Sequence, residues 1–188
     1  IGERNLKDPN DGQKYYISTK AVVHPKYRAC SDSFGNDIAL LMIEGAVINV
    51  PYFSSNGLGS TNHICLPTAA TNLQSGTNVI TAGWGRTNKN NDNTANIQQF
   101  ATVQIAEDSK CSKTYGSSYD PNTMICAFTP GKSSCNGDSG TALFTVPTGS
   151  AKADAVGITS FGMENCEGNP VVYTKVAAHL NFINENLK

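Results

Sequence analysis

Short apolar runs broken by turn residues constrain the fold of this chain more than any other feature of its sequence. Runs rich in Val, Ile, Thr, Tyr and Phe alternate with clusters that contain Gly and Pro, a pattern typical of antiparallel β-proteins and not of alternating β–α units. We predict strands at residues 14–23, 37–44, 78–84, 99–105, 123–127, 141–146, 155–161 and 171–175. The sequence therefore predicts an all-β fold.

The end of the chain carries the one helical signal that we find. Val176, Leu180, Ile183 and Leu187 recur at spacings of four, three and four residues, which places them on one face of a helix. We expect one amphipathic helix at about 176–188.

Residues 87–96 form a nearly uninterrupted polar run, Thr-Asn-Lys-Asn-Asn-Asp-Asn-Thr-Ala-Asn. Such a run has little to bury, which predicts an exposed, mobile loop. A linker between domains is the alternative. Strand-like segments of similar composition resume on both sides, and this favours the loop.

Charge and length limit the classes of partner. The 188 residues include 14 Lys and Arg against 15 Asp and Glu, for a formal net charge of −1. Nucleic-acid and polybasic membrane binders depend on clustered Lys and Arg, so we expect neither partner. No apolar run approaches the ~18 residues of a membrane span, and no basic-then-apolar leader opens the chain.

Six cysteines and three histidines raise the question of metal binding. The chain has no Cys-x-x-Cys pair and no His-x-x-x-His pair, and the histidines lie far apart in sequence, so we expect no metal and no cofactor. An even cysteine count in a chain rich in Asn, Ser, Thr and Gly favours disulfides and a secreted, extracellular protein. Six cysteines can pair in fifteen ways, and composition alone leaves the pairing open.

Residues 133–140 read Ser-Ser-Cys-Asn-Gly-Asp-Ser-Gly and indicate acyl-transfer chemistry. A serine hydroxyl becomes a useful nucleophile when a base takes its proton and donors stabilise the resulting oxyanion. The small Gly137 lets its own N–H and that of Ser139 point into one space where an oxyanion could lie. The alternative is an ordinary glycine-rich turn.

Segments that flank this motif carry a family resemblance. Eight segments, in order along the chain, resemble the chymotrypsin-like (trypsin-fold) serine proteases: residues 23–27, 36–41, 64–67, 82–85, 124–127, 133–140, 157–162 and 170–173. The resemblance implies two six-stranded antiparallel Greek-key barrels and a C-terminal helix. One protease domain would fill residues 1–188, with a first-barrel remnant at about 1–70, the second barrel at about 71–175 and the helix at about 176–188.

The resemblance also implies catalytic roles. Ser139 matches the nucleophile and Asp37 the buried carboxylate that orients the triad histidine. Gly137 and Ser139 would donate to the oxyanion. Asp138 would hold the ammonium that forms when a zymogen is cleaved. Ser160 would support Asp37, and the edge at residues 160–162 would pair with a protein or peptide substrate as an added strand.

A shallow specificity pocket is a further implication. The residues that match it are Ser133, Ser134, Asn136, Ser160, Phe161, Gly162 and Val171. Ser133 stands where an Asp would select Arg or Lys, and Val171 stands where many relatives have Gly. We therefore expect a preference for small or medium apolar side chains.

The triad histidine and the strands around it have no counterpart in this sequence. His24, His63 and His179 do not match the family's catalytic position. A separate polypeptide, a truncated sequence and a lost histidine are three explanations. We favour the first two, because a barrel that lacks strands exposes unpaired edges and apolar faces. The expected partners are thus a second polypeptide with the N-terminal strands and the histidine, and protein inhibitors.

The remaining implications concern disulfides and calcium. Cys111 would pair with Cys126 and Cys135 with Cys166, which leaves Cys30 and Cys65 unassigned. The calcium loop of some relatives is half matched by Glu3 and Asn5, but Gln13 stands where a carboxylate is expected, so we expect no calcium.

A catalytically inactive homologue that binds proteins is the alternative function. Thr141-Ala142 support this alternative, because they replace the Gly-Pro that the family usually has after the serine motif. Ile1 has an ammonium suited to Asp138, but the following Gly-Glu-Arg does not continue the family's activation sequence.

Overall fold

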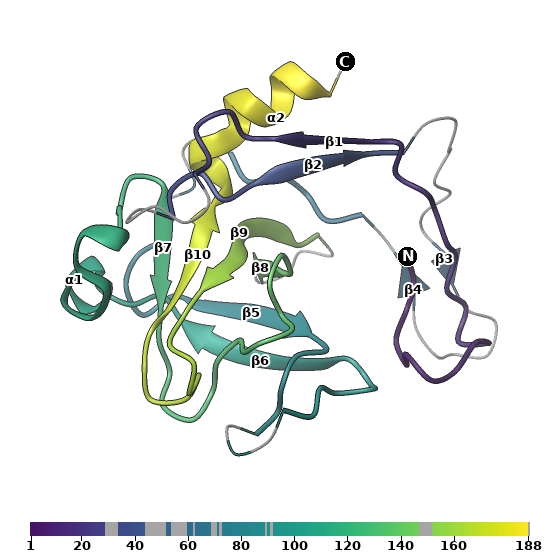
Figure 1. Ribbon diagram of the computed structural model, residues 1–188, viewed down its shortest axis with the longest axis horizontal. Coiled ribbons are helices and arrows are strands. Elements are labelled where there is room, and N and C mark those ends of the chain that lie inside the picture. The colour runs from purple at the N-terminus through teal and green to yellow at the C-terminus, as the bar shows by residue number, and fades with distance from the viewer. Residues whose placement is uncertain are drawn as a thin grey trace.

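The computed structural model confirms an all-β fold (Figure 1). It describes residues 1–28, 34–43, 52–53, 60–61, 63–68, 71, 73–88, 90, 92–146 and 152–187. The strands among these residues are β1 Lys20–Val23, β2 Ala39–Met42, β3 Tyr52–Phe53, β4 Ser60–Thr61, β5 Asn78–Gly83, β6 Gln99–Gln104, β7 Met124–Ala127, β8 Ala142–Thr145, β9 Asp154–Phe161 and β10 Val171–Lys175. No helix in the described ranges has the length and apolar character needed to cross a bilayer.

Strands β5 to β10 form one antiparallel sheet that curls into a closed barrel. Its strand order is β6-β5-β8-β9-β10-β7. The two end strands meet at an isolated antiparallel bridge between Ile105 and Ala127, where the Ala106 N–H donates to the Cys126 carbonyl. Val79, Val103, Leu143 and other apolar side chains fill the interior.

β7 and β10 are buried on both faces over almost their whole length. Ile125 and Tyr173 point into the barrel core, whereas Cys126 and Val172 pack on the outside against Cys111 of the helix α1, Asp108–Tyr115. Because alternate residues face opposite sides of a strand, every residue of β7 is buried.

The first part of the described chain forms two separate two-stranded sheets, β1-β2 and β3-β4. The first sheet lies next to the C-terminal α2, Leu180–Asn186 (Figure 1). Its Val22 and Leu40 side chains pack against Ile38 and Phe182 in one apolar cluster. Residues on the other side are open to solvent. We predicted a strand at 14–23, but the observed strand β1 begins only at Lys20, where its ladder with β2 starts.

The helices differ from the prediction in two respects. α1 was not predicted, because it buries only Cys111 and therefore has no apolar stripe. The tail that we predicted as one helix begins as a 3-10 turn, η2 Val176–His179, and continues as α2. The described part of the polar run 87–96 is mostly exposed, and Arg86 pairs with Thr94 across its base.

Candidate active site

Asp37 is held by two strands of the closed barrel. One carboxylate oxygen, Oδ2, accepts a hydrogen bond from Ser160 Oγ at 2.7 Å, and its carbonyl oxygen accepts one from Thr174 Oγ1 at 2.8 Å. Ser160 lies on β9 and Thr174 on β10. Asp37 is half-buried and precedes β2, so these contacts connect the first part of the chain to the barrel.

Ser139 lies exposed at the tip of a tight turn between residues 135 and 141. The Asp138 N–H donates to the Cys135 carbonyl at 2.9 Å, and the Thr141 N–H donates to the Asp138 carbonyl at 3.0 Å. Gly137 has a φ of 98°, which a residue with a Cβ rarely adopts. In the described part of the chain, no group accepts the N–H of Gly137 or of Ser139. Two N–H donors next to one hydroxyl are thus available to a ligand.

The Asp138 carboxylate points away from Ser139, toward the 83–85 turn. Its Oδ1 accepts from the Gly85 N–H at 2.7 Å and its Oδ2 from the Cys135 N–H at 2.9 Å. A Cβ at Gly83 or Gly85 would overlap this carboxylate, which explains the Gly-Trp-Gly sequence there. The Ile1 ammonium is elsewhere and donates to the Lys14 carbonyl at 2.8 Å.

A pocket of about 180 Å³ adjoins Ser139. It brings together six of the seven residues that we predicted to bind substrate: Ser134, Asn136, Ser160, Phe161, Gly162 and Val171. The seventh, Ser133, donates to the carbonyls of Ser134 and Cys166 and lines the neighbouring cavity of Asp138 instead. Ser139 and Ser160 line the same pocket, so the nucleophile candidate and the support of Asp37 are neighbours.

Ser134, which lines the pocket, belongs to a buried network of hydroxyl groups. Ser134 Oγ lies 2.7 Å from Thr81 Oγ1 and 2.8 Å from the Tyr173 hydroxyl. Burial raises the pKa of Tyr173, so this hydroxyl stays protonated and can donate. A methyl of Val171 lies 3.5 Å from where a Cβ of Gly162 would stand, which shows how closely this side chain approaches the opposite wall.

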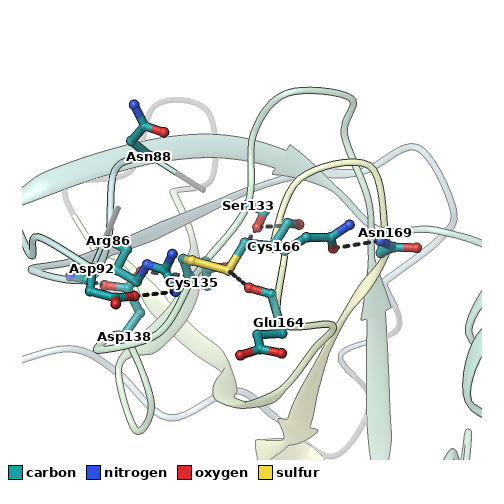
Figure 2. Close-up of a disulfide and its surroundings, with 12 residues drawn as sticks. Arg86, Asn88, Asp92, Ser133, Cys135, Asp138, Glu164, Cys166 and Asn169 are labelled. Atoms are coloured by element: carbon teal, nitrogen blue, oxygen red, sulfur yellow. Dashed lines mark hydrogen bonds and ion pairs between the residues drawn. A yellow bond between two sulfur atoms is a disulfide. The ribbon is translucent and has the colours of Figure 1, made fainter. Parts of the chain in front are cut away.

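Two disulfides brace the region, and they are the pairs that the resemblance implied. Cys111 bonds to Cys126, and Cys135 bonds to Cys166. Figure 2 shows the second bond joining the serine loop to the loop at 163–169, with an ion pair between Arg86 and Asp92 beside it. Arg86 Nη1 and Asp92 Oδ1 are 3.1 Å apart. Cys65 is a free thiol among the residues that the structure describes, and Cys30 lies outside them.

None of the three histidines is among the described residues that line the pocket of Ser139. His24 packs edge-on against His179 and contacts Phe182, and His179 is bonded to Lys175 and Asn36. His63 is exposed. Among the residues described, neither Ser139 nor the Asp37 carboxylate has a histidine partner.

Three residues near the pocket were missed in the sequence. Thr174 supports Asp37, the Tyr115 hydroxyl donates to the Pro170 carbonyl, and Phe34 packs on Phe161 with ring centroids 4.8 Å apart. No local pattern identifies them, because each contact joins residues that are distant in the chain.

The N-terminal loop offers two carboxylates to a cation. Glu3 Oε1 and Asp11 Oδ1 are buried without a hydrogen-bond partner, and burial together with the facing Asp11 raises the pKa of Glu3. Calcium takes six to eight oxygen ligands, and in the described ranges no three His, Cys, Asp or Glu side chains converge. We assign no metal chemistry to these residues.

Comparison with known proteins gives the class to which this fold and pocket belong. A family profile described as Trypsin matches residues 1–183. The chain belongs to the chymotrypsin-like serine protease family.

Individual relatives support the same assignment. The chain is 33% identical over its whole length to "Chymotrypsin-like elastase family member 1" of Macaca fascicularis, and it covers 68% of that protein. It is 36% identical to "Trypsin-1" of Astacus astacus, over 94% of this chain and 70% of the relative. It is 32% identical over its whole length to "Melanization protease 1" of Drosophila melanogaster, and spans 47% of it. The chain thus spans about half to two thirds of the relatives it matches.

Proposed function

We propose that this chain is the main part of a secreted serine endopeptidase whose triad histidine comes from a segment outside these 188 residues, on the same polypeptide or a second one. The observation that carries the proposal is the 2.7 Å hydrogen bond from Ser160 to Asp37, because Ser160 and Ser139 line one pocket. An acid and a nucleophile at one pocket need only an imidazole between them to complete a triad.

In the proposed reaction, Ser139 Oγ attacks the substrate carbonyl while the supplied histidine takes its proton. Asp37 stabilises the imidazolium, and the N–H groups of Gly137 and Ser139 donate to the oxyanion. The histidine then protonates the leaving amine, and water hydrolyses the acyl-enzyme by the reverse proton path. Asp138 would bind the ammonium of an activated N-terminus. It would then give up the hydrogen bonds that it now accepts from the N–H groups of Gly85 and Cys135.

The substrate backbone would add to the free edge of β9. The pairing of β8 with β9 ends at Ala142 and Ile158, and its last hydrogen bonds are at Thr159. Residues 160–162 therefore have an edge, next to the pocket, that an extended peptide can pair with. Protein inhibitors would use this edge in the same way.

A fluorophosphonate that reacts with activated serines tests the assignment. We expect the full encoded protein, processed to its active form, to be labelled on Ser139, and Ser139→Ala and Asp37→Asn to reduce peptide hydrolysis by about 10⁶-fold and 10⁴-fold. The isolated 188-residue chain should label far more slowly. A homogeneous 19.9 kDa chain that hydrolyses peptide esters would refute the need for a supplied histidine. Absence of labelling on the processed protein would favour the inactive, protein-binding homologue.

A panel of peptides that differ at the residue before the cleaved bond tests the pocket. We expect Ala, Val and Leu to be cleaved better than Phe, Tyr or Arg, because Val171 narrows the pocket. Val171→Gly should raise kcat/KM for Phe relative to Ala by about tenfold or more. Fastest cleavage after Arg would contradict this preference.

A further inference from the structure

His179 is a buried titratable residue that the proposed reaction does not use. It ends η2, and its side chain is only 3% exposed. Its Nδ1 lies 2.8 Å from the Lys175 carbonyl oxygen and its Nε2 lies 3.3 Å from Asn36 Oδ1. Asn36 immediately precedes Asp37, so this ring contacts the residue next to the proposed catalytic acid.

Asn36 has a left-handed backbone conformation, with a φ of 59°. Residues with a Cβ avoid this region, and Asn tolerates it better than most. The turn at Asn36 sets the direction in which the chain enters Asp37. Ser160 and Thr174 bind Asp37 itself, whereas His179 binds the Asn36 side chain.

Hydrogen-bond chemistry shows that this contact does not depend on one protonation state. The Lys175 carbonyl can only accept, so Nδ1 must carry a hydrogen. A neutral ring then accepts at Nε2 from the Asn36 amide NH₂, and a charged ring donates to the amide oxygen. Asn36 presents either group by rotating its amide half a turn. His24 lies edge-on to this ring, with ring centroids 5.4 Å apart.

We infer that His179 is a positioning residue for the catalytic acid: through Asn36, it holds the left-handed turn that directs Asp37 toward Ser160 and the triad base. This inference rests on the proposed function, because the catalytic role of Asp37 belongs to that proposal.

The inference makes different predictions for kcat and for KM. Asp37 orients the base and does not touch the substrate, so a misdirected carboxylate should slow the chemical step and leave substrate binding unchanged. Glycine adopts a positive φ without help from a side chain. An Asn36→Gly variant should therefore keep the turn and no longer need His179.

The test is a double-mutant cycle on the full encoded protein in its active form. We expect His179→Phe to lower kcat about tenfold with KM within about twofold, and the same substitution in an Asn36→Gly background to lower kcat less than twofold. His179→Gln keeps a polar group that can reach Asn36 and should retain more activity than His179→Phe. His24→Phe is the matched control, since His24 touches the ring but not Asn36, and its kcat should stay unchanged.

Each other result has a defined meaning. An equal fall in both backgrounds would show that His179 acts through packing and would overturn the inference. No fall with His179→Phe, while Asp37→Asn abolishes activity, would overturn the inference and leave the proposed function intact. If Asp37→Asn keeps the full kcat, Asp37 is not the catalytic acid, and this result would overturn both the inference and the proposed function. If His179→Phe fails to fold, Asn36→Ala against Asn36→Gly decides, because only the alanine should lower kcat.

Discussion

The closed barrel and the β1-β2 sheet are built from the same kind of short apolar strand, yet they bury it very differently. In the barrel, Leu143 and Val79 are 0% exposed. In and beside the two-stranded sheet, Leu41 is 68% exposed and Ile17 is 83% exposed. The burial of a strand thus depends on which other element packs against it, and the sequence of the strand alone does not specify that element.

The candidate site draws on both regions. Ser139, Ser134 and Gly162 belong to the barrel, whereas Asp37 belongs to the region that is open to solvent. Its two hydrogen bonds to Ser160 and Thr174 attach it to the barrel. The position of the acid can therefore be secured by the barrel even where its own sheet is exposed.

The largest expected effect is in the barrel core. Leu143→Ala should lower the free energy of unfolding by about 3 to 5 kcal/mol, since a fully buried leucine leaves a cavity between closed strands. Urea denaturation measures this difference. A cost below about 1 kcal/mol would mean that the barrel interior is not closely packed.

The disulfide of the serine loop should come next. Replacing Cys135 and Cys166 by serine opens a loop of 31 residues, and chain entropy predicts a loss of about 3 to 4 kcal/mol. Cys65→Ser is the matched control, because Cys65 is a free thiol, and should change stability by less than about 0.5 kcal/mol. Equal losses in the two variants would contradict the assigned bonding.

Leu41→Ala probes the open sheet. We expect a change within about 0.5 kcal/mol in the 188-residue chain, because the side chain is mostly solvated. In the full encoded protein the cost should rise to about 1 to 3 kcal/mol if an upstream segment covers this face. Unfolding of both proteins by urea gives the comparison, and an unchanged cost would show that the face stays open.

The smallest expected effect is the pH dependence at His24, where the open sheet meets α2. Burial, followed by the charges of His179 and Lys26, lowers the pKa of His24. The folded state therefore binds fewer protons than the unfolded chain as the pH falls below about 6.5, and stability should decrease between pH 7 and pH 5. His24→Gln should show a smaller fall in Tm over this range. An identical fall would assign the dependence to other groups.

The sequence predicted the barrel strands to within one or two residues, since each is a short apolar run with turn residues at its ends. β1 was predicted too long because residues 14–19 are rich in Tyr, Ile and Thr, whereas the ladder between β1 and β2 begins only at Lys20. α1 was missed because one buried cysteine makes no periodic pattern.

The candidate site was predicted from short motifs, and the resemblance also supplied one distant contact, that of Ser160 with Asp37. Contacts of residues outside the motifs could not be predicted. The serine turn is encoded by consecutive residues, among them Gly137. The bonds of Thr174 to Asp37 and of His179 to Asn36 span 137 and 143 positions, so they exist only after the barrel closes on the first part of the chain.

Because β7 and β10 are buried on both faces, neighbouring residues along each strand contact different parts of the protein. Val172 faces α1 and its disulfide, whereas the adjacent Tyr173 reaches Ser134, which lines the pocket. Substitutions on the α1 side can therefore accumulate without altering the hydroxyl network of Ser134. In the proposed enzyme, substitutions that alter the pocket would fall at one alternate set of positions along β10, and substitutions that alter the packing of α1 would fall at the other.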